Sequence, residues 1–391
     1  MGNGPTNLCF IMHIGIDCRT MSGKGGIAHY TYNLVKNLLI QDKKNTYVLF
    51  FGAKVSQNLK NTLEQDNCSI KYFPGSNLKK VIPFVYSHFV NGIFLNKQKL
   101  DLFHAPTGSF PLAYRGRAVI TIHDLAIYKH PEWFPACQWF SKKIVVPRSL
   151  KKAKRIIAVS ENTKQDIIDL FKIPQKKIQV IYEAASLASQ RGRQGLMIKQ
   201  SSLGAKLDNL GDYALFIGTL EPRKNLVRLI KAFALYCRKY PQKTEKLVIA
   251  GGEGWKFKQI YQTVTGFRLK TRVIFTGYIS EKEKIGLLQG AKAFISPSLY
   301  EGFGLPVLEA MSLGIPVICG NNSALKEISG HASFLVDSCN IRSILEGLTK
   351  VLSNKSLRED LKAKGLVRAK QFAWSKCAKE TIGLYNSIIT S

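Results

Sequence analysis

Acidic side chains are scarce in this chain of 391 residues, where 26 Asp and Glu stand against 57 Lys and Arg and leave a net charge of +31. Long apolar runs are absent too, since the nearest candidate, residues 81–95, is interrupted by Pro83, His88 and Asn91. Without about 18 consecutive apolar residues, no transmembrane helix is predicted. The start of the sequence has no apolar segment followed by a small-residue cleavage site, so no secretory signal is predicted. These absences predict a cytoplasmic protein.

Metal-binding and disulfide patterns are also missing. The eight cysteines are scattered, with no Cys-x-x-Cys pair and no histidine at zinc spacing. No Asp-x-Asp triplet occurs, so no metal site is predicted. The dinucleotide fingerprint G-x-G-x-x-G and the Walker A motif are absent as well. The cysteine pattern suits a reducing compartment, where thiols stay free.

The basic excess is compatible with three partners: nucleic acid, an anionic membrane or phosphorylated small molecules. No nucleic-acid-binding motif occurs and the aromatic residues follow core periodicity, so no nucleic-acid partner is expected. The densest basic run, residues 142–155, contains no acid. It is either a solvated helix face or a patch for acidic lipid head groups, worth about 1 kcal/mol per basic residue. We favour peripheral contact with the inner face of the membrane, and residues 78–96 predict a core or interfacial helix.

Residues 293–320 have the pattern of one strand–helix–strand unit. Residues 293–296 predict a short buried strand, and 305–313 a helix with Pro306 in its first turn, where a missing N–H costs nothing. Gly314 is expected to close the helix, and 315–319 to form the next strand. The loop between them, 298–304, contains glycines and leads into a helix N-terminus. Such a loop offers free N–H groups and a positive dipole end to an anion such as a diphosphate.

Two carboxylates bracket this loop: Glu301 lies within it and Glu309 in the helix, with seven residues between them. Taken alone, they could be a solvated loop acid and an ordinary first-turn acid. With Gly-Phe-Gly-Leu-Pro between them and the strand–loop–helix context, however, the stretch resembles the signature of the retaining glycosyltransferases of family 4. The resemblance extends over nearly the whole chain.

That resemblance implies the α/β GT-B fold, in which two Rossmann-like domains face each other across a cleft. We expect an acceptor domain at residues 1–186, a linker at 187–212 and a donor-binding domain at 213–372. The remaining residues, 373–391, are expected to form a C-terminal helix that packs back on the first domain.

Several predicted strands end in residues with the chemistry of a donor site. Strand 13–19 leads to a glycine cluster with Gly25 and Gly26, and strand 118–122 leads to His123. In the second domain, strand 213–218 ends at Gly218 and is followed by two cations just before a helix, Arg223 and Lys224. Strand 273–277 leads to Tyr278 and Ile279, which border the nucleotide base in the family.

The resemblance also implies the roles. Glu301 and His123 would position the sugar from opposite domains, so that domain closure is part of catalysis. Arg223 and Lys224 would take up charge as the diphosphate leaves. The catalytic set is therefore Glu301, His123, Arg223 and Lys224. The donor-binding set is Glu309, which would hold the ribose, with Gly302, Phe303, Gly304, Leu305, Gly25, Gly26, Gly218, Tyr278 and Ile279.

The sequence around His123, with His130-Pro-Glu-Trp-Phe-Pro135, resembles the mannosyltransferase-like branch of the family. This favours GDP-mannose as donor, without metal, and a saccharide or lipid-linked acceptor in surface polysaccharide synthesis. The sequence departs from the family pattern in two places. Thr219 stands where many relatives have Arg, and the four residues 183–186 read Glu-Ala-Ala-Ser instead of Asn-Gly-Val-Asp. We expect Arg223 to substitute for the missing Arg. Another GT-B enzyme (an epimerase or a phosphorylase), an inactive scaffold and a basic nucleic-acid binder stay open as alternatives.

Overall fold

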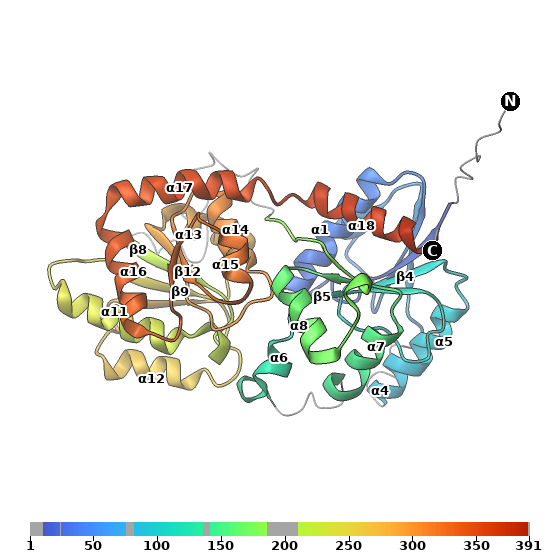
Figure 1. Ribbon diagram of the computed structural model, residues 1–391, viewed down its shortest axis with the longest axis horizontal. Helices are drawn as coiled ribbons and strands as arrows, with labels where there is room; N and C mark the ends of the chain where they lie inside the picture. Colours follow the sequence, from blue (N-terminus) through green and yellow to red (C-terminus); the bar gives the residue numbers. More distant parts are fainter. Residues whose placement is uncertain (1–10, 24, 76–81, 136–140, 186–209, 390–391) are drawn as a thin grey trace.

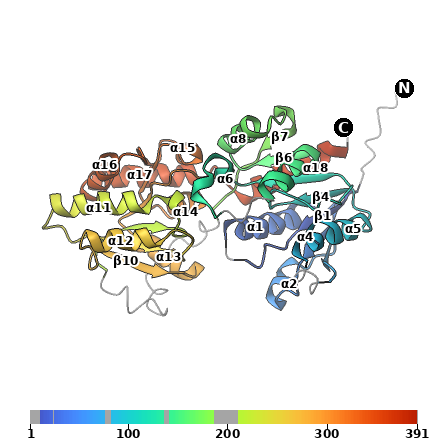
Figure 2. The ribbon, with the colours of Figure 1, turned by 90° about the horizontal axis from the view of Figure 1, so that it is seen from below.

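The chain folds into two lobes that lie side by side, each built on a parallel sheet flanked by helices (Figure 1). This computed structural model describes residues 11–23, 25–75, 82–135, 141–185 and 210–389. Figure 2 shows the two lobes from below, with α1 and α14 near the boundary between them. Within the described ranges, no helix combines the length and the apolar character needed to cross a bilayer.

The N-terminal lobe contains a seven-stranded sheet in the order β3-β2-β1-β4-β5-β6-β7. Its strands are β1 (His13–Asp17), β2 (Thr46–Phe51), β3 (Cys68–Tyr72), β4 (Leu102–Ala105), β5 (Ala118–Ile122), β6 (Arg155–Ala158) and β7 (Ile178–Val180). Its helices are α1 (Gly26–Gln41), α2 (Gln57–Leu63), α4 (Pro83–Val85), η1 (Tyr86–Val90), α5 (Asn91–Asn96), α6 (Ala126–Lys129), η2 (Pro131–Trp133), η4 (Ser141–Val145), α7 (Val146–Lys152), α8 (Glu161–Phe171) and η5 (Gln175–Lys177).

The C-terminal lobe contains a six-stranded sheet in the order β10-β9-β8-β11-β12-β13. Its strands are β8 (Tyr213–Ile217), β9 (Lys246–Ala250), β10 (Val273–Gly277), β11 (Ala293–Ser296), β12 (Val317–Gly320) and β13 (Phe334–Val336). Its helices are η7 (Pro222–Lys224), α11 (Leu226–Lys239), α12 (Lys258–Gly266), α13 (Glu281–Gly290), α14 (Leu305–Ser312), α15 (Ser323–Ser329), α16 (Ile341–Ser353) and α17 (Lys355–Ala369). The last helix, α18 (Trp374–Ile389), runs from this lobe back across the other.

The strands are short and apolar because both faces of each sheet are covered. Every residue of β5, β11 and β12 is buried, and all strand pairs are parallel. In each sheet the order reverses at the first strand: β1 lies between β2 and β4, and β8 between β9 and β11. Ligands of such sheets bind outside the carboxyl ends of the strands at this reversal.

The predicted pair of parallel-sheet lobes is confirmed, and so is the returning helix. α18 packs along α1, and its Tyr385 hydroxyl forms a buried hydrogen bond of 2.6 Å with His104 Nδ1 on β4. The predicted domain limits stay a prediction, and most of the linker 187–212 lies outside the described residues. The six cysteines in the described ranges are free thiols.

Two predicted strands, 13–19 and 315–319, differ from the observed strands by two residues at one end, for local reasons. β1 stops at Asp17, two residues early, because its carboxylate folds the chain back by accepting from the N–H of Arg19 at 3.1 Å. β12 begins at Val317 rather than at 315, because Pro316 has no N–H for the ladder. The helix α8 begins after an N-cap at Ser160, whose side chain accepts from the Thr163 N–H.

Candidate active site

The loops that follow five strands, β1, β5, β8, β10 and β11, meet between the two lobes. A cavity of about 260 Å³ lies there, lined by α1 and its preceding loop on one side and by the C-terminal lobe on the other. Seven residues of the predicted donor-binding set line it: Gly25, Gly26, Gly218, Tyr278, Ile279, Leu305 and Glu309. The cavity thus sits at the reversal point of the C-terminal sheet, where a ligand is expected.

Glu309 is the buried acid of this cavity, and a lysine holds it in place. Lys284 on α13 donates from Nζ to Oε1 of Glu309 at 2.7 Å and pairs with Glu281 at 3.0 Å. Burial by itself would lower the pKa of Lys284, but the two carboxylates outweigh it and raise the pKa. Because one lysine faces two acids, the cavity wall keeps a negative charge, and its carboxylate oxygens can accept hydrogen bonds from hydroxyl groups.

Glu301, Arg223 and Lys224 form a second charged cluster, which we call the triad. Lys224 Nζ lies 2.6 Å from Oε1 of Glu301, and an Arg223 nitrogen lies 2.7 Å from Oε2. Burial would raise the pKa of Glu301, but the charges of Lys224 and Arg223 outweigh it and lower the pKa to about 2. Glu301 is therefore a carboxylate at any ordinary pH.

The triad adjoins the cavity rather than lining it. The guanidinium of Arg223 also pairs with Glu221 at 2.8 Å and donates to the Tyr300 carbonyl oxygen at 3.1 Å. Lys224 reaches the cavity wall, because its side chain packs against Gly218. With two acids facing two cations, the triad and Glu221 together carry no net charge. The predicted diphosphate cations are thus already paired in this structure.

The glycine loop before α14 is shaped by the opposite lobe. The carbonyl oxygen of Gly302 accepts from the hydroxyls of Ser160 at 2.7 Å and Thr163 at 3.2 Å. A Cβ atom on Gly302 would overlap the carbonyl oxygen of His123, so only glycine fits. Gly304 has a φ of 106° and serves as the N-cap of α14 without a side-chain cap. In the first turn of α14, Pro306 has no N–H and Val307 donates its N–H to the Gly304 carbonyl oxygen at 3.0 Å, so Leu305 carries the N–H that could meet a bound anion.

Phe303 does not line the cavity. Its ring lies 6.4 Å from that of Tyr182 and 5.9 Å from that of Phe372, centroid to centroid. These aromatic contacts join the α14 loop to the end of the N-terminal lobe and to the segment before α18. The place of Phe303 is therefore in the contact between the lobes.

His123 is held by two acceptors. Its Nδ1 lies 2.8 Å from Oε1 of Glu183, and its Nε2 lies 2.8 Å from the carbonyl oxygen of Pro106. The ring of Tyr30 packs edge-on against it, with 4.7 Å between centroids. Its main chain touches Gly302, so His123 lies beside the loop that carries Glu301.

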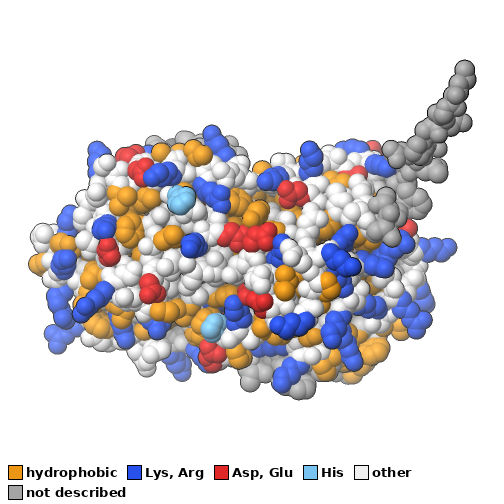
Figure 3. Space-filling model, viewed as in Figure 1, with side chains coloured by type: hydrophobic (Ala, Val, Ile, Leu, Met, Phe, Trp, Pro, Cys, Tyr) orange, Lys and Arg blue, Asp and Glu red, His pale blue; other side chains and the backbone are white. Residues whose placement is uncertain are grey.

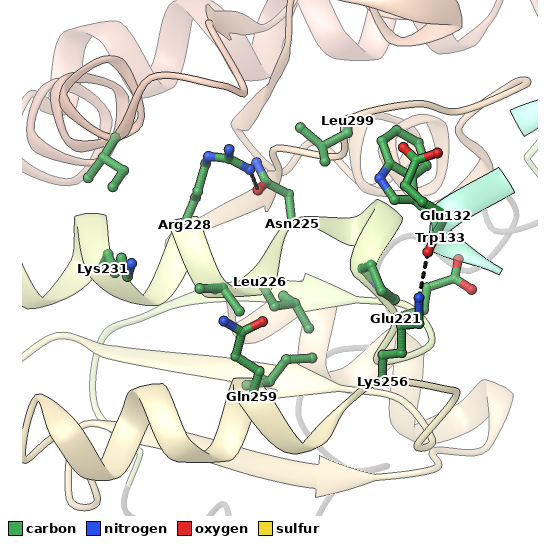
Figure 4. Close-up of a pocket in the computed structure, with 14 residues that line it drawn as sticks. Glu132, Trp133, Glu221, Asn225, Leu226, Arg228, Lys231, Lys256, Gln259 and Leu299 are labelled. Atoms are coloured by element: carbon green, nitrogen blue, oxygen red, sulfur yellow. Dashed lines mark hydrogen bonds between the residues drawn. The ribbon is translucent and has the colours of Figure 1, made fainter. Parts of the chain in front are cut away.

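A larger cavity, of about 620 Å³, lies on the other side of the turn between Glu221 and Asn225 (Figure 4). Trp133 and Glu132 reach it from the N-terminal lobe, and Lys256 donates to the carbonyl oxygen of Glu132 at 2.5 Å. The predicted site residues lie elsewhere: none of them lines this cavity in the described part of the chain. We assign the smaller cavity as the candidate active site because seven of the predicted donor-binding residues line it.

Sequence reasoning missed several residues of this site. Lys284, His29 and Thr219 line or border the small cavity, and Glu183 pairs with His123. Lys284 is the last of four consecutive charged residues that open α13, from Glu281 to Lys284, so no signal in the sequence singles it out. Glu183 did have one, because it stands at the first of the four positions that depart from the family pattern.

Comparisons with known proteins identify the family and the fold. Residues 24–188 match the family described as Glycosyltransferase Family 4, and residues 205–367 match Glycosyl transferases group 1. The O-antigen chain mannosyltransferase B of Escherichia coli is 31% identical over 92% of this chain and 95% of its own length. The O-antigen chain mannosyltransferase RfbU of Salmonella typhimurium is 27% identical over 67% of this chain and 68% of its own.

Solved structures show the same fold. HepE from Anabaena, solved with UDP and glucose, has a TM-score of 0.73 at 18% identity and covers 96% of this chain and 100% of its own. WaaG, a glycosyltransferase involved in lipopolysaccharide biosynthesis, has a TM-score of 0.71 at 13% identity and covers 94% of this chain and 98% of its own. The sequence match over nearly the full length of both proteins settles the family: this chain is a glycosyltransferase and belongs to glycosyltransferase family 4.

Proposed function

We propose that this enzyme transfers mannose from a nucleotide diphosphate sugar, GDP-mannose, to a saccharide or lipid-linked acceptor, with retention at the anomeric carbon. One observation carries the proposal: a cavity between the lobes combines the buried acid Glu309 with glycine loops from both domains. We take the triad and His123, whose main chain touches the loop that carries Glu301, as the groups that would meet the diphosphate and the sugar.

The donor would lie along the cavity with its nucleoside at the C-terminal lobe. Glu309 would accept hydrogen bonds from the ribose hydroxyls, and Tyr278, which is 57% exposed, would cover the base. The N-terminus of α14 would receive the diphosphate, because the positive end of the helix dipole lies there and Gly304 has no side chain to cap it.

The triad would change partners when the donor binds. Sugar hydroxyls would donate hydrogen bonds to Glu301 and replace its contacts with Arg223 and Lys224. These two cations would then stabilise the negative charge of the diphosphate as it leaves. This exchange places the electrostatic stabilisation where negative charge develops. We further propose that no metal takes part and that the acceptor attacks from the face of the sugar on which the diphosphate departs.

The sugar and the acceptor rest on the relatives. Two of them carry the name O-antigen chain mannosyltransferase, and another relative, from Campylobacter jejuni, is named for a diphospho-undecaprenol substrate. These names support mannose as the transferred sugar and a lipid-linked saccharide as the acceptor, in the synthesis of a surface polysaccharide.

The two glutamates should separate binding from turnover. Glu309→Ala should weaken donor binding about tenfold or more, because the ribose loses a charged acceptor worth about 1.5–3 kcal/mol. Glu301→Ala should mainly lower kcat, because it acts on the sugar. Isothermal titration with GDP-mannose, GDP, UDP, ADP and dTDP measures the first effect, and initial rates measure the second.

The matched control is Glu346→Ala, which removes an exposed acid of α16 far from the cavity. Unchanged donor affinity in Glu309→Ala would refute the assignment of the cavity. Release of GDP only when acceptor is present, in an assay that contains a chelator, would distinguish a transferase from an epimerase or a phosphorylase.

We also propose that the N-terminal lobe docks on an anionic membrane. The segment of α4, η1 and α5 packs Tyr86 and Leu95 into the core and leaves Phe84, Phe89 and Ile93 exposed, by 38–53%. In the described part, 82–96, one face is therefore buried in the core, and the exposed face supports the proposal of an interfacial helix; residues 76–81 lie outside the described ranges.

The basic helix α7 supplies the charge beside this apolar face. The stretch 110–114 lies between them, since Ala113 donates its N–H to the His88 carbonyl oxygen and Phe110 donates its N–H to Ser149 Oγ on α7. Figure 3 shows Lys and Arg side chains over α7 and hydrophobic side chains beside them at the lower right. This pairing of exposed aromatic rings with cations fits an interface that holds acidic lipids.

The docking surface predicts co-sedimentation with vesicles. The enzyme should bind vesicles that contain phosphatidylglycerol and not pure phosphatidylcholine vesicles, and high salt should weaken the binding. Phe89→Ser with Ile93→Ser should lower the bound fraction severalfold, as should Arg148→Glu with Lys151→Glu. Matched changes on the other lobe, Lys350→Glu with Lys364→Glu, should have a smaller effect; equal loss in both sets would contradict a defined surface.

A further inference from the structure

Glu183 is a buried carboxylate whose role in the reaction is so far unassigned. It is 3% exposed and follows β7, at the point where the chain departs from the family pattern. Its Oε1 atom lies 2.8 Å from His123 Nδ1 and so connects the end of β7 to the end of β5. A buried charge without a partner would be costly, so this contact determines the state of both groups.

The two hydrogen bonds of His123 determine where its protons lie. The Pro106 carbonyl oxygen can only accept, so Nε2 must carry a proton and donate. On the other side, Nδ1 faces a carboxylate, and an ionised carboxylate also only accepts. With Glu183 ionised, both nitrogens donate and the ring is an imidazolium.

We propose that Glu183 is a positioning residue: it holds His123 doubly protonated and fixed in orientation at the sugar end of the cleft. A neutral ring has one N–H and could satisfy only one of the two acceptors, so it would turn or leave a buried oxygen unpaired. This inference rests on the proposed function, because it takes the ring as part of the wall against which the transferred sugar lies.

The arrangement changes what His123 offers to a sugar. With both nitrogens bonded within the protein, the ring presents its carbon edge to a ligand, and that edge is polarised by the positive charge. The sequence predicts that His123 positions the sugar, and the structure limits how it can do so. A ring nitrogen could donate to a sugar hydroxyl only if one of its two hydrogen bonds within the protein broke. Glu183 balances the charge of the ring, so the pair adds no net charge to the sugar pocket.

The groups around the His123 ring come from α1, β4, β5 and α18 and from the residue that follows His123 in the chain. Tyr30 of α1 packs edge-on against it, and Asp124 follows it in the chain. His104 of β4 lies behind it, bonded to Thr121 of β5 and to Tyr385 of α18. Cys377 of α18 is a buried thiol near Glu183. Glu183 is the group among these that makes a direct charged contact with the ring.

The pH dependence follows from these neighbours. Burial lowers the pKa of His123, and the hydrogen bond and charge of Glu183 outweigh burial and raise the pKa above its ordinary value. The imidazolium therefore persists to higher pH than in an ordinary histidine and is lost as the pH rises through the raised pKa. Without the charge of Glu183, burial remains, and the ring should become neutral at neutral pH.

Glu183→Gln tests this, because glutamine keeps the size of the side chain and removes its charge. In the full-length protein, the NMR titration of His123, assigned by the loss of its signal in His123→Gln, should shift so that the pKa falls below about 6.5. The alkaline limb of the rate–pH profile at saturating donor should shift to lower pH in parallel. Glu183→Asp, which restores the charge, should recover part of both effects.

Glu132→Gln is the control, because it removes an exposed carboxylate that lies 3.2 Å from His130 and does not line the small cavity. This control substitution should leave the alkaline limb of the rate–pH profile at the wild-type pH. An unchanged pKa of His123 in Glu183→Gln would overturn the proposal, and so would a lowered pKa with an unchanged rate profile. The NMR result is independent of catalysis, so a wild type that transfers no sugar would refute the proposed function and leave the proton assignment to be judged alone.

Discussion

At the scale of single residues, the site is a set of buried charges that compensate one another. Glu301 faces Lys224 and Arg223, Arg223 also faces Glu221, and Glu309 faces Lys284. Removing one partner of such a pair leaves an uncompensated charge and costs more than the pair contributes. These residues must therefore be read as pairs, and a substitution at one changes the state of the next.

The lowered pKa of Glu301 predicts a dependence of stability on pH. Its pKa is about 2, against an ordinary value of 4.5. A carboxyl with a depressed pKa stabilises the fold above its ordinary pKa, and this contribution is lost as the pH falls towards about 2. The difference corresponds to about 3 kcal/mol. Wild type should therefore melt at a higher temperature than Glu301→Gln at neutral pH, and the gap should narrow as the pH falls from about 5 to about 3.

Thermal melts of both proteins over this pH range measure the gap. Glu346→Gln is a suitable control, because its carboxylate is about half exposed and pairs only with Lys350 on the same helix. Its gap to wild type should be small at every pH. A gap between wild type and Glu301→Gln that stays constant on acidification would show that Glu301 is not held ionised by the triad.

At the scale of elements, the sequence predicted best where local signals agree. For residues 293–314 a short apolar run, glycines, a first-turn proline and a closing glycine all indicated one unit, and β11 and α14 follow it within a residue. Gly314 closes the helix with a φ of 77°. The local signals gave the positions of the candidate site residues on this unit and at the ends of β8 and β10, and the family resemblance supplied their expected roles.

Elements that depend on tertiary contacts were not predicted. α12 and α15 are helices of nine and seven residues without a strong start signal, and they are stabilised by packing in the C-terminal lobe. The hydrogen bond pattern of η1 also has no signature in the sequence. The pairs Glu183–His123 and Lys284–Glu309 join residues 60 and 25 positions apart, so only the fold could reveal them.

At the scale of the whole molecule, the lobes are joined by polar contacts around the α14 loop. Ser160 and Thr163 donate to the Gly302 carbonyl oxygen, and the Tyr300 hydroxyl donates to Asp166 at 2.5 Å. Glu327 of α15 accepts from the N–H groups of Glu161 and Asn162 at 2.8 and 3.1 Å. These contacts describe a closed arrangement in which the loop that carries Glu301 is held by α8.

Among these contacts between the lobes, we chose that of Glu327 for substitution because Glu327 does not line the small cavity. It places a carboxylate from one lobe at the N-terminus of a helix in the other, where an anion is stabilised by the helix dipole and by free N–H groups. Loss of such a cap costs about 1 kcal/mol, or about fivefold in the ratio of closed to open enzyme. Glu327→Ala should therefore lower kcat/KM for the donor about fivefold.

Small-angle scattering and donor kinetics on the same preparations measure this effect. Glu327→Ala should increase the radius of gyration without donor, and saturating GDP-mannose should restore the wild-type value, because donor binding favours the closed form. Glu359→Ala is the control, because its side chain is 62% exposed and its partner, Lys362, lies on the same helix. Glu327→Ala with wild-type scattering and wild-type kcat/KM would show that the lobes close without this cap, and the shared Gly302 contacts would then have to hold them.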